Sequence, residues 1–267
     1  MAARARPSST SKPVSANSSE SDLRAFFNSP HIHALKLQIC DIGRRLWQRA
    51  YVDGNGGNIA IRVGKDLALC TPTLVSKGFM KPEDLCLVDL EGTQLCGGQD
   101  RTSEILMHLQ IMKRQPRAVA TVHCHPPYGT GFALAGVEPP TGMVSEFEIF
   151  VSAAVAPYCT PGTPELGRLV ADLADNHNTI LMANHGVVAW SHNNVEDAYF
   201  KIEILEACCR TVLVASQLGK RLKKMTPVQL QGLLEIKRKL GIPDLRFGLK
   251  DTRFGNPGMP PVAPGCR

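Results

Sequence analysis

The stretch AVATVHCHPP, Ala118–Pro127, is an apolar run that ends in His-Cys-His and is stopped by two prolines. We predict a buried strand here, and side chains alternate between the two faces of a strand. His123 and His125 would therefore point to the same side, which gives half of a divalent-metal site at the strand end. The simpler alternative is one histidine buried as a hydrogen-bonded core residue and one exposed to solvent. The rest of the chain has to decide between these two interpretations.

The composition is typical of a soluble globular protein with a sizeable core. Of the 267 residues, 43% are hydrophobic and 20% are charged. No apolar run approaches the roughly 20 residues that span a bilayer, so we expect no membrane association. The formal charge of +6 is modest, and the densest basic run, Lys220–Lys224, has no aromatic residues among its charges. A nucleic-acid partner is therefore not expected, and we interpret the run as the solvated C-terminal end of a helix.

The cysteines indicate a reducing compartment. None of the nine belongs to a C-x-x-C motif, and the adjacent Cys208 and Cys209 are poorly placed for a structural disulfide. The basic residues near the N-terminus are not followed by the apolar stretch of a secretory signal. We therefore expect a cytoplasmic protein.

Helical and strand patterns alternate between residues 30 and 245, without a repeat or a break in composition. The sequence predicts helices at about 30–49, 101–114, 163–175, 194–218 and 227–240, and strands at 59–63, 67–70, 85–90, 118–125, 179–183 and 187–190. Such mixing predicts one α/β domain over residues 21–245, with helices on both faces of a mixed sheet. Residues 1–20 have almost no large apolar side chains and residues 246–267 are rich in Pro and Gly. We expect a disordered N-terminal segment and an irregular C-terminal tail.

A catalytic zinc needs three protein ligands and an open position. His185 is the best third candidate, because it lies in an Asn-His-Gly turn at a strand end, where Gly186 lets the backbone bend sharply. His108 on a predicted helix and His177 at a polar helix end are its rivals. The remaining histidines lie among polar loop signals and are discounted: His31, His33 and His192.

A metal site that moves protons also needs a base. Glu104 lies at a predicted helix start, directly after Thr102 and Ser103, either of which can cap the helix. A carboxylate is favoured in a first helical turn, so ordinary capping would explain Glu104 as well as catalysis would.

Two loops could bind a phosphate. Gly54–Asn58 could cradle one through successive backbone N–H groups, although a plain glycine-rich turn has the same pattern. Ser76-Lys77-Gly78 offers a hydroxyl, an ammonium and a glycine, which would suit an oxyanion. A solvated loop lysine is the alternative there.

These motifs follow a set order: GGN before a strand, T-P-T before a loop, T-S-E at a helix start, H-x-H at a strand end, and then N-H-G. The combination resembles the class II aldolase/adducin family, which includes the L-fuculose-1-phosphate and L-rhamnulose-1-phosphate aldolases and the ribulose-5-phosphate 4-epimerases. The resemblance covers about residues 30–245. The segments TPTLVSKGF and ILMANHGVVAW look most like the class II aldolases associated with bacterial microcompartments.

The resemblance implies a three-layer α/β/α fold with a central mixed, mostly antiparallel sheet, in a C4 homotetramer with active sites at the subunit junctions. It implies one Zn²⁺ per chain on His123, His125 and His185. Glu104 would be the fourth ligand at rest and the acid/base once substrate binds. The residues that match the family's phosphate-binding positions are Asn58, Thr73, Thr102 and Ser103. To these we add Ser76, Lys77 and Gly78 as phosphate-binding candidates on their own chemistry.

The implied reaction is reversible aldol cleavage of L-fuculose or L-rhamnulose 1-phosphate to dihydroxyacetone phosphate and L-lactaldehyde. Zinc would act as a Lewis acid, and Glu104 would move the proton at the reacting carbon. Family epimerases tend to carry Asp at this position, so Glu104 favours carbon–carbon cleavage. Metal-dependent decarboxylases, dehydratases and 4-epimerases of phosphorylated sugars remain alternatives. A non-catalytic adducin-like interaction module is a further alternative. The presence of all three histidines and Glu104 argues against it.

Three departures from the family pattern bear on this interpretation. The fuculose-phosphate aldolases carry a tyrosine in the loop after H-x-H, where this chain has PPTGMVSEFE with Glu146, and another in the last helix, where it has Leu240. The glycine after T-P-T is replaced by Leu74.

The sequence also adds segments at both ends of the family core. The microcompartment-type resemblance predicts that one of them helps recruit the enzyme to a shell or to another enzyme, with Phe26 and Phe27 as candidate N-terminal contacts.

Overall fold

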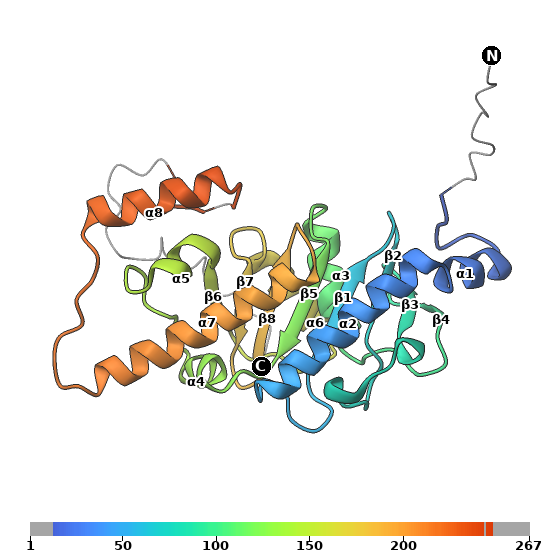
Figure 1. Cartoon of the computed structure of the whole chain (residues 1–267), viewed down its shortest axis with the longest axis horizontal. Coiled ribbons are helices and arrows are strands. Elements are labelled where there is room, and N and C mark those ends of the chain that lie inside the picture. Colours follow the sequence, from blue (N-terminus) through green and yellow to red (C-terminus); the bar gives the residue numbers. More distant parts are fainter. Residues whose placement is uncertain (1–12, 243, 248–267) are drawn as a thin grey trace, which may run out of the picture.

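A mixed sheet runs through the centre of the molecule, and helices cover both of its faces (Figure 1). The computed structural model describes residues 13–242 and 244–247. Within them the helices are α1 (Glu20–Phe27), α2 (Pro30–Gln48), α3 (Ile105–Arg114), α4 (Pro127–Ala135), α5 (Ser145–Phe150), α6 (Pro164–Leu173), α7 (Val195–Ser216) and α8 (Pro227–Lys239), with short turns η1 (Lys77–Phe79) and η2 (Pro82–Asp84). The strands are β1 (Asn58–Arg62), β2 (Leu67–Cys70), β3 (Cys86–Asp89), β4 (Gln94–Cys96), β5 (Ala120–Cys124), β6 (Ala153–Ala156), β7 (Thr179–Met182) and β8 (Gly186–Ser191).

The strand that carries His-Cys-His lies near the centre of the sheet. In the described residues the order of the eight strands is β4-β3-β2-β1-β5-β8-β7-β6, and all neighbours are antiparallel except β6 and β7. Asn58 of β1 lies opposite His123 of β5, and Cys124 lies opposite Val187 of β8. This register brings the glycine-rich loop before β1 and the turn before β8 to the same end of β5.

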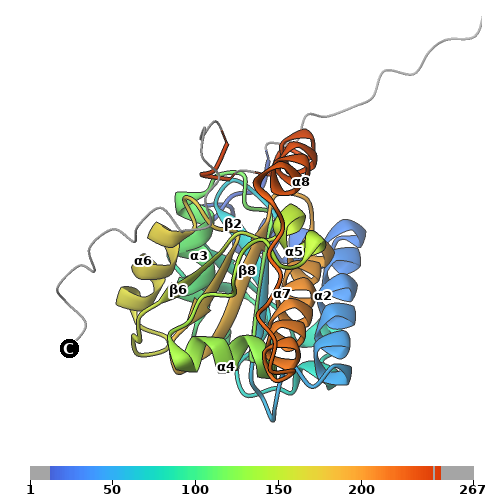
Figure 2. The same ribbon diagram turned by 90° about the vertical axis from the view of Figure 1, so that its left-hand side faces the viewer.

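Successive residues of the central strands face different layers, as strand alternation requires. Ile59 and Val122 lie in the apolar cluster that includes residues of α2 and α7, whereas Ala60 and Val188 lie in the cluster that includes residues of α3 and α6. Figure 2 shows these two helical layers on either side of the sheet. The predicted three-layer α/β/α fold with a mixed, mostly antiparallel sheet is confirmed.

Local capping residues set several helix starts that the sequence predicts. The Asn194 side chain accepts a hydrogen bond from the N–H of Asp197 at 2.8 Å, and the Thr163 hydroxyl accepts one from the N–H of Leu166 at 3.3 Å. No helix in the described parts of the chain is long and apolar enough to cross a membrane. Most of the predicted N-terminal segment 1–20 and of the tail 246–267 lies outside the described residues.

Two local predictions are wrong. The helix expected from Arg101 begins at Ile105, with Glu104 rather than Thr102 or Ser103 as its N-cap residue. Residues 101–102 are extended rather than helical, because Arg101 pairs with Pro72 in an antiparallel bridge and the N–H of Thr102 donates to the carbonyl of Thr71 at 3.0 Å.

The basic run Lys220–Lys224 is also not part of a helix. It lies in the connection between α7, which ends at Ser216, and α8. Gly219, with a left-handed φ of 67°, follows the helix end, where such a conformation is typical. The run therefore does not complement a helix C-terminus.

Candidate metal centre

Three histidines from separate segments converge at the end of β5. His123 is fully buried within β5, His125 follows the strand, and His185 lies in the turn that leads into β8. One ligand atom of each lies within 4.8 Å of those of the other two, and the ring centroids are 4.7, 5.0 and 5.6 Å apart. Since β5 and β8 are adjacent, residues separated by sixty positions in the sequence meet at this point.

Glu104 completes the group from the start of α3. Its Oε2 lies 3.4 Å from His123 Nε2, and its Oε1 lies 3.2 Å from His185 Nε2. The Asn58 side-chain NH2 donates to Oε2 at 2.8 Å. Burial alone would raise the pKa of Glu104, but the positive charge that His123 and His185 carry when protonated, together with the hydrogen bond from the Asn58 amide, lowers it. Glu104 is therefore a carboxylate in the resting site.

Hydrogen bonds orient two of the imidazoles. His123 Nδ1 donates to the carbonyl of Val187 at 2.9 Å, which turns its Nε2 toward the centre of the group. Burial lowers the pKa of His123 well below its ordinary value, so the ring is neutral, which is the form that binds a metal. His125 Nδ1 lies 3.3 Å from Asp53 Oδ1. A carboxylate of this kind is a common outer partner of a metal-binding histidine, and the sequence analysis did not single out Asp53.

The turn that carries His185 differs in detail from the prediction. The left-handed residue is Asn184, with a φ of 56°, and not Gly186. A Cβ on Gly186 would lie 2.6 Å from His125 Cδ2 and 2.7 Å from the carbonyl oxygen of Cys124. The glycine is needed here because the rings pack against its backbone.

The residues present fit a divalent cation. Among the described residues, six buried side-chain nitrogen or oxygen atoms lack a hydrogen-bond partner, and four of them belong to this group: Glu104 Oε1, His123 Nε2, His125 Nε2 and His185 Nδ1. Unpaired buried polar atoms are costly, and a set of imidazoles with a carboxylate is a common zinc environment. The histidine triad therefore forms a divalent-metal site.

The predicted phosphate-binding segments lie beside this group. The N–H of Thr73 donates to the carbonyl of Asp100 at 2.9 Å, and the N–H of Thr102 donates to that of Thr71, so the T-P-T and T-S-E motifs run side by side. Thr102 is buried, whereas Ser103 is exposed at the surface. The replacement residue Leu74 has a left-handed φ of 56° and is 79% exposed. A glycine would adopt this conformation without strain, which explains its use there in the family.

Lys77 is buried, contrary to the alternative of a solvated loop lysine. Only 1% of its surface is exposed, and its Nζ donates to the carbonyls of Asn55, at 2.9 Å, and of Val75. Burial lowers its pKa to about 8, and the charge of Glu104 opposes this effect. Ser76 and Gly78 flank it at η1, with Gly78 packed against Trp47. The lysine thus joins the loop before β1 to the loop after β2.

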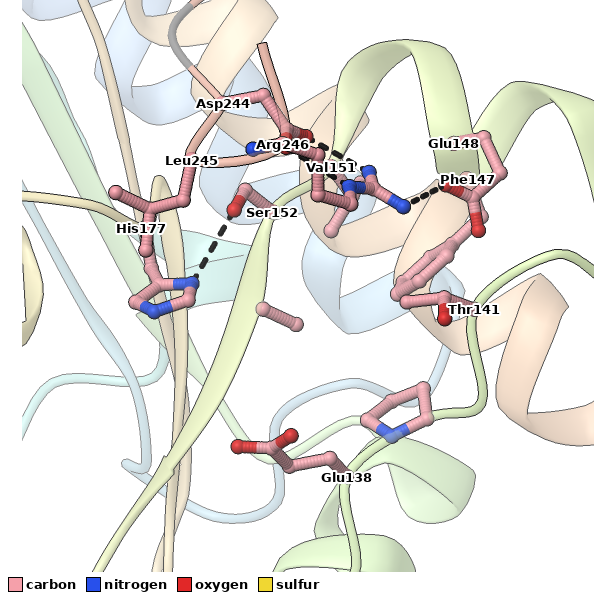
Figure 3. Close-up of a pocket in the computed structure, with 12 residues that line it drawn as sticks. Glu138, Thr141, Phe147, Glu148, Val151, Ser152, His177, Asp244, Leu245 and Arg246 are labelled. Atoms are coloured by element: carbon pink, nitrogen blue, oxygen red, sulfur yellow. Dashed lines mark hydrogen bonds and ion pairs between the residues drawn. The ribbon is translucent and has the colours of Figure 1, made fainter. Parts of the chain in front are cut away.

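The rival histidines lie elsewhere. His108 is fully buried behind Asn58, and His177 lies in a second pocket, where its Nδ1 is 3.2 Å from the Ser152 hydroxyl (Figure 3). This pocket is small, about 40 Å³, and its lining includes none of the triad. Arg246 closes one side through ion pairs with Glu148 and Asp244, both at 2.7 Å. Arg246, expected in the irregular tail, is thus held on the domain by its side chain.

Glu146 lies near the sequence position of one family tyrosine, and Leu240 stands where the other is found. Glu146 is exposed in the first turn of α5 and lines a groove of about 760 Å³ between α4 and α7, together with Tyr128 and Arg210. Leu240 follows α8 and is 49% exposed. Within the described residues, neither side chain forms a hydrogen bond or an ion pair with a histidine of the triad.

Three histidines and a glutamate thus meet at the end of the central strand of an α/β/α fold, where they form a preformed site for a divalent metal. A family profile, the Class II Aldolase and Adducin N-terminal domain, matches residues 37–213. The chain therefore belongs to the class II aldolase/adducin family.

Individual relatives divide between two activities. An L-fuculose phosphate aldolase of Methanococcus maripaludis is 34% identical over 185 residues, which cover 69% of this chain and 97% of that protein. A 3-oxo-tetronate 4-phosphate decarboxylase of Haemophilus influenzae is 29% identical over 205 residues, which cover 75% and 96%. An L-fuculose 1-phosphate aldolase structure superposes with a TM-score of 0.68 at 26% identity, covering 76% of this chain and 95% of that one. The chain is a metal-dependent member of the class II aldolase superfamily.

Proposed function

We propose that the chain is a zinc-dependent class II aldolase that cleaves L-fuculose or L-rhamnulose 1-phosphate to dihydroxyacetone phosphate and L-lactaldehyde. The observation that carries the proposal is the position of Glu104, whose carboxylate lies beside two histidines of the triad and keeps one oxygen without a hydrogen-bond partner. The aldolase relative at 34% identity supports cleavage as the reaction.

The residues of the chain would divide the work as follows. A divalent ion on His123, His125 and His185 supplies Lewis-acid polarisation of the substrate carbonyl. In the cleavage direction the bond between carbons 3 and 4 breaks, the carbon-4 hydroxyl loses its proton, and carbon 3 gains one. Glu104, which lies beside both His123 and His185, would move the proton, and such acid–base catalysis typically contributes about 10²- to 10⁴-fold.

The substrate phosphate would bind where the loops meet beside Glu104. We assign this role to Asn58, Thr73, Ser76, Lys77, Gly78, Thr102 and Ser103. Backbone hydrogen bonds hold the T-P-T and T-S-E segments together. Within the described residues, Lys77 is held by two carbonyls rather than by a carboxylate, so a phosphate nearby would provide a compensating charge.

A decarboxylase of 3-oxo acid 4-phosphates is the second candidate. The Haemophilus influenzae relative covers more of the chain than the aldolase relative does. The two tyrosines of the fuculose-phosphate aldolases are also absent: the loop after H-x-H has none, and Leu240 stands at the second position. An adducin-like module without metal is disfavoured because the triad and Glu104 are intact and correctly grouped.

The deciding experiment is a product assay. The purified zinc-loaded protein is incubated with a panel of ketose 1-phosphates and 3-oxo acid 4-phosphates, and dihydroxyacetone phosphate, aldehyde and carbon dioxide are measured. We expect dihydroxyacetone phosphate and aldehyde in equal amounts from a 6-deoxyketose 1-phosphate, and none from a His123→Ala control. Carbon dioxide release from an oxo acid, with no aldehyde from any ketose, would replace this proposal by the decarboxylase.

We also propose zinc as the metal and a C4 homotetramer as the assembly. Metal analysis of protein purified without chelators should find about one zinc per chain. Light scattering should give about four times the 29.0 kDa chain mass. A chain that is monomeric at working concentration would reject the tetramer.

Recruitment to a microcompartment shell, or to an enzyme inside it, is a further proposal that rests on the microcompartment-type resemblance. Residues 1–30 and 245–267 would be fused separately to a fluorescent reporter in a host that produces shells. One fusion should form puncta that the reporter alone does not form. Diffuse fluorescence from both fusions would reject the terminal segments as sufficient targeting signals, leaving a cytoplasmic enzyme.

A further inference from the structure

A row of buried polar side chains lies directly behind Glu104. Asn58 donates to Glu104 Oε2 at 2.8 Å, and its carbonyl oxygen is hydrogen-bonded to His108 Nε2. His108 Nδ1 lies 2.6 Å from the Thr121 hydroxyl. His108 and Thr121 are fully buried, and Asn58 is 4% exposed. The row therefore runs from the centre of the sheet to the carboxylate with almost no exposure to solvent.

Three elements of the fold contribute to the row. Asn58 is on β1 and Thr121 is on β5, where it lies opposite Ala60, so both face the layer that holds α3. His108 follows Glu104 by one helical turn, and residues four apart share one face of a helix. Glu104 and His108 therefore lie on the same face of α3, the face that packs against the sheet. Glu104 reaches the histidines at the strand end, and His108 lies over the sheet.

The hydrogen bonds of the row can have only one direction while Glu104 is ionised. A carboxylate only accepts, so the Asn58 NH2 must face Glu104 and its carbonyl oxygen must face His108. His108 must then carry its proton on Nε2, and its Nδ1 must accept from the Thr121 hydroxyl. Burial lowers the pKa of His108 to about 4, so a neutral ring with one donor and one acceptor is the form present near neutral pH.

We propose that His108 and Thr121 are positioning residues that fix the orientation of the Asn58 amide and thereby hold the Glu104 carboxylate between His123 and His185. This inference rests on the proposed acid/base role of Glu104. Without the donor on His108, the Asn58 amide could turn over and present its oxygen to the carboxylate, and two acceptors repel each other. One hydrogen of the Asn58 NH2 remains for a substrate oxygen, so the row is compatible with phosphate binding.

The first test measures the tautomer and needs no turnover. In the zinc-loaded protein with 15N-labelled histidine, long-range 1H–15N spectra should show His108 protonated on Nε2 and unprotonated on Nδ1. The signal is assigned by its loss in His108→Gln. A ring protonated on Nδ1 would overturn the proposal, whether or not the protein proves to be an aldolase.

The second test measures turnover in matched variants. His108→Leu removes both ring nitrogens, whereas His108→Gln keeps a donor for Asn58 and an acceptor for Thr121. Loss of an outer partner of a metal site typically costs about 10- to 100-fold. We expect a loss of this size in kcat for His108→Leu, with KM little changed and zinc content retained, and recovery of most of it in His108→Gln.

The control is His177→Leu, because His177 also pairs through Nδ1 with a hydroxyl, that of Ser152, but lies in the pocket away from the triad. Like His108→Leu, this variant replaces a hydrogen-bonded histidine by leucine, and it should leave kcat unchanged.

If kcat is unchanged in His108→Leu as well, His108 is only a satisfied core residue. If His108→Leu does not fold, His108→Gln and the tautomer measurement still decide. If the wild-type protein turns over none of the substrates, the aldolase proposal is rejected. The His108 tautomer then still tests the hydrogen-bonded row by itself.

Discussion

Replacement of Gly186 by alanine should damage the metal centre without removing any ligand. The added Cβ would lie 2.6 Å from His125 Cδ2, 2.7 Å from the carbonyl oxygen of Cys124 and 3.2 Å from His123 Cε1. Carbon contacts in a packed interior are normally 3.5–4.0 Å, so at least two of these neighbours must move by several tenths of an ångström or more.

The direction of that movement matters. The Cys124 carbonyl belongs to β5, and Cys124 is paired with Val187 of β8, so this atom cannot yield without separating two central strands. The His125 ring is partly exposed and gives way more easily. We therefore expect the ring to turn out of the triad. Overpacking of this kind typically costs about 1–3 kcal/mol of stability, and a misplaced ligand should weaken zinc binding by about 10- to 100-fold.

The assay is a zinc titration of the metal-free variant against a chromophoric chelator, with the folded state checked by circular dichroism and the free energy of unfolding measured in urea. Gly131→Ala is the control, since a Cβ there meets nothing within 4 Å. Gly131 lies within α4, where alanine is the better helix former by up to about 1 kcal/mol. If Gly186→Ala binds zinc with the wild-type Kd, the packing of the two rings against this glycine does not position the ligands, and the reasoning fails.

The remaining predictions concern the site residues themselves. His123→Ala and His185→Ala should each lose zinc and activity while keeping the wild-type circular dichroism spectrum, because the core of the sheet does not depend on the metal; full zinc occupancy in the His185 variant would show that the third ligand is another residue. Glu104→Gln should keep substrate binding and lose about 10²- to 10⁴-fold in kcat, since an amide cannot move a proton; near-normal turnover would reduce Glu104 to a helix N-cap. In the metal-free protein, the folded-state pKa of His108 is about 4 against an ordinary value of 6.5, so the unfolded chain takes up this proton first as the pH falls. The contribution of His108 to the free energy of unfolding is therefore complete above about pH 6.5. It falls by about 3 kcal/mol as the pH decreases to about 4. Urea unfolding across this range should show a flatter pH dependence in His108→Gln, and an unchanged slope would contradict the assignment.

The sequence alone determined the features that depend on short-range rules. Strand alternation places His123 and His125 on one side of the strand and Cys124 on the other. The side chains of Thr163 and Asn194 cap α6 and α7 and so fix where these helices begin. These rules act between residues a few positions apart, so a pattern of residue types is sufficient to apply them. The Asn-His-Gly turn at a strand end made His185 the best third ligand, and the order of the family motifs supported that choice and predicted the fold.

The tertiary structure decided how those segments meet. The helix α3 starts only at Ile105 because residues 101–102 pair with residues 71–72. Asp53 lies beside His125 because the pairing of β1 with β5 brings the loop before β1 to the end of β5. Lys77 could be recognised as buried only once two loops were seen to close over it.

His108 is the clearest case. In the sequence it is one histidine on an amphipathic helix and a rival for the metal. Its role is set by Asn58, fifty residues earlier, and by Thr121, on a different strand. Strand order and register bring these partners together through the burial of apolar surface over the whole sheet, and no local pattern in the sequence specifies that pairing.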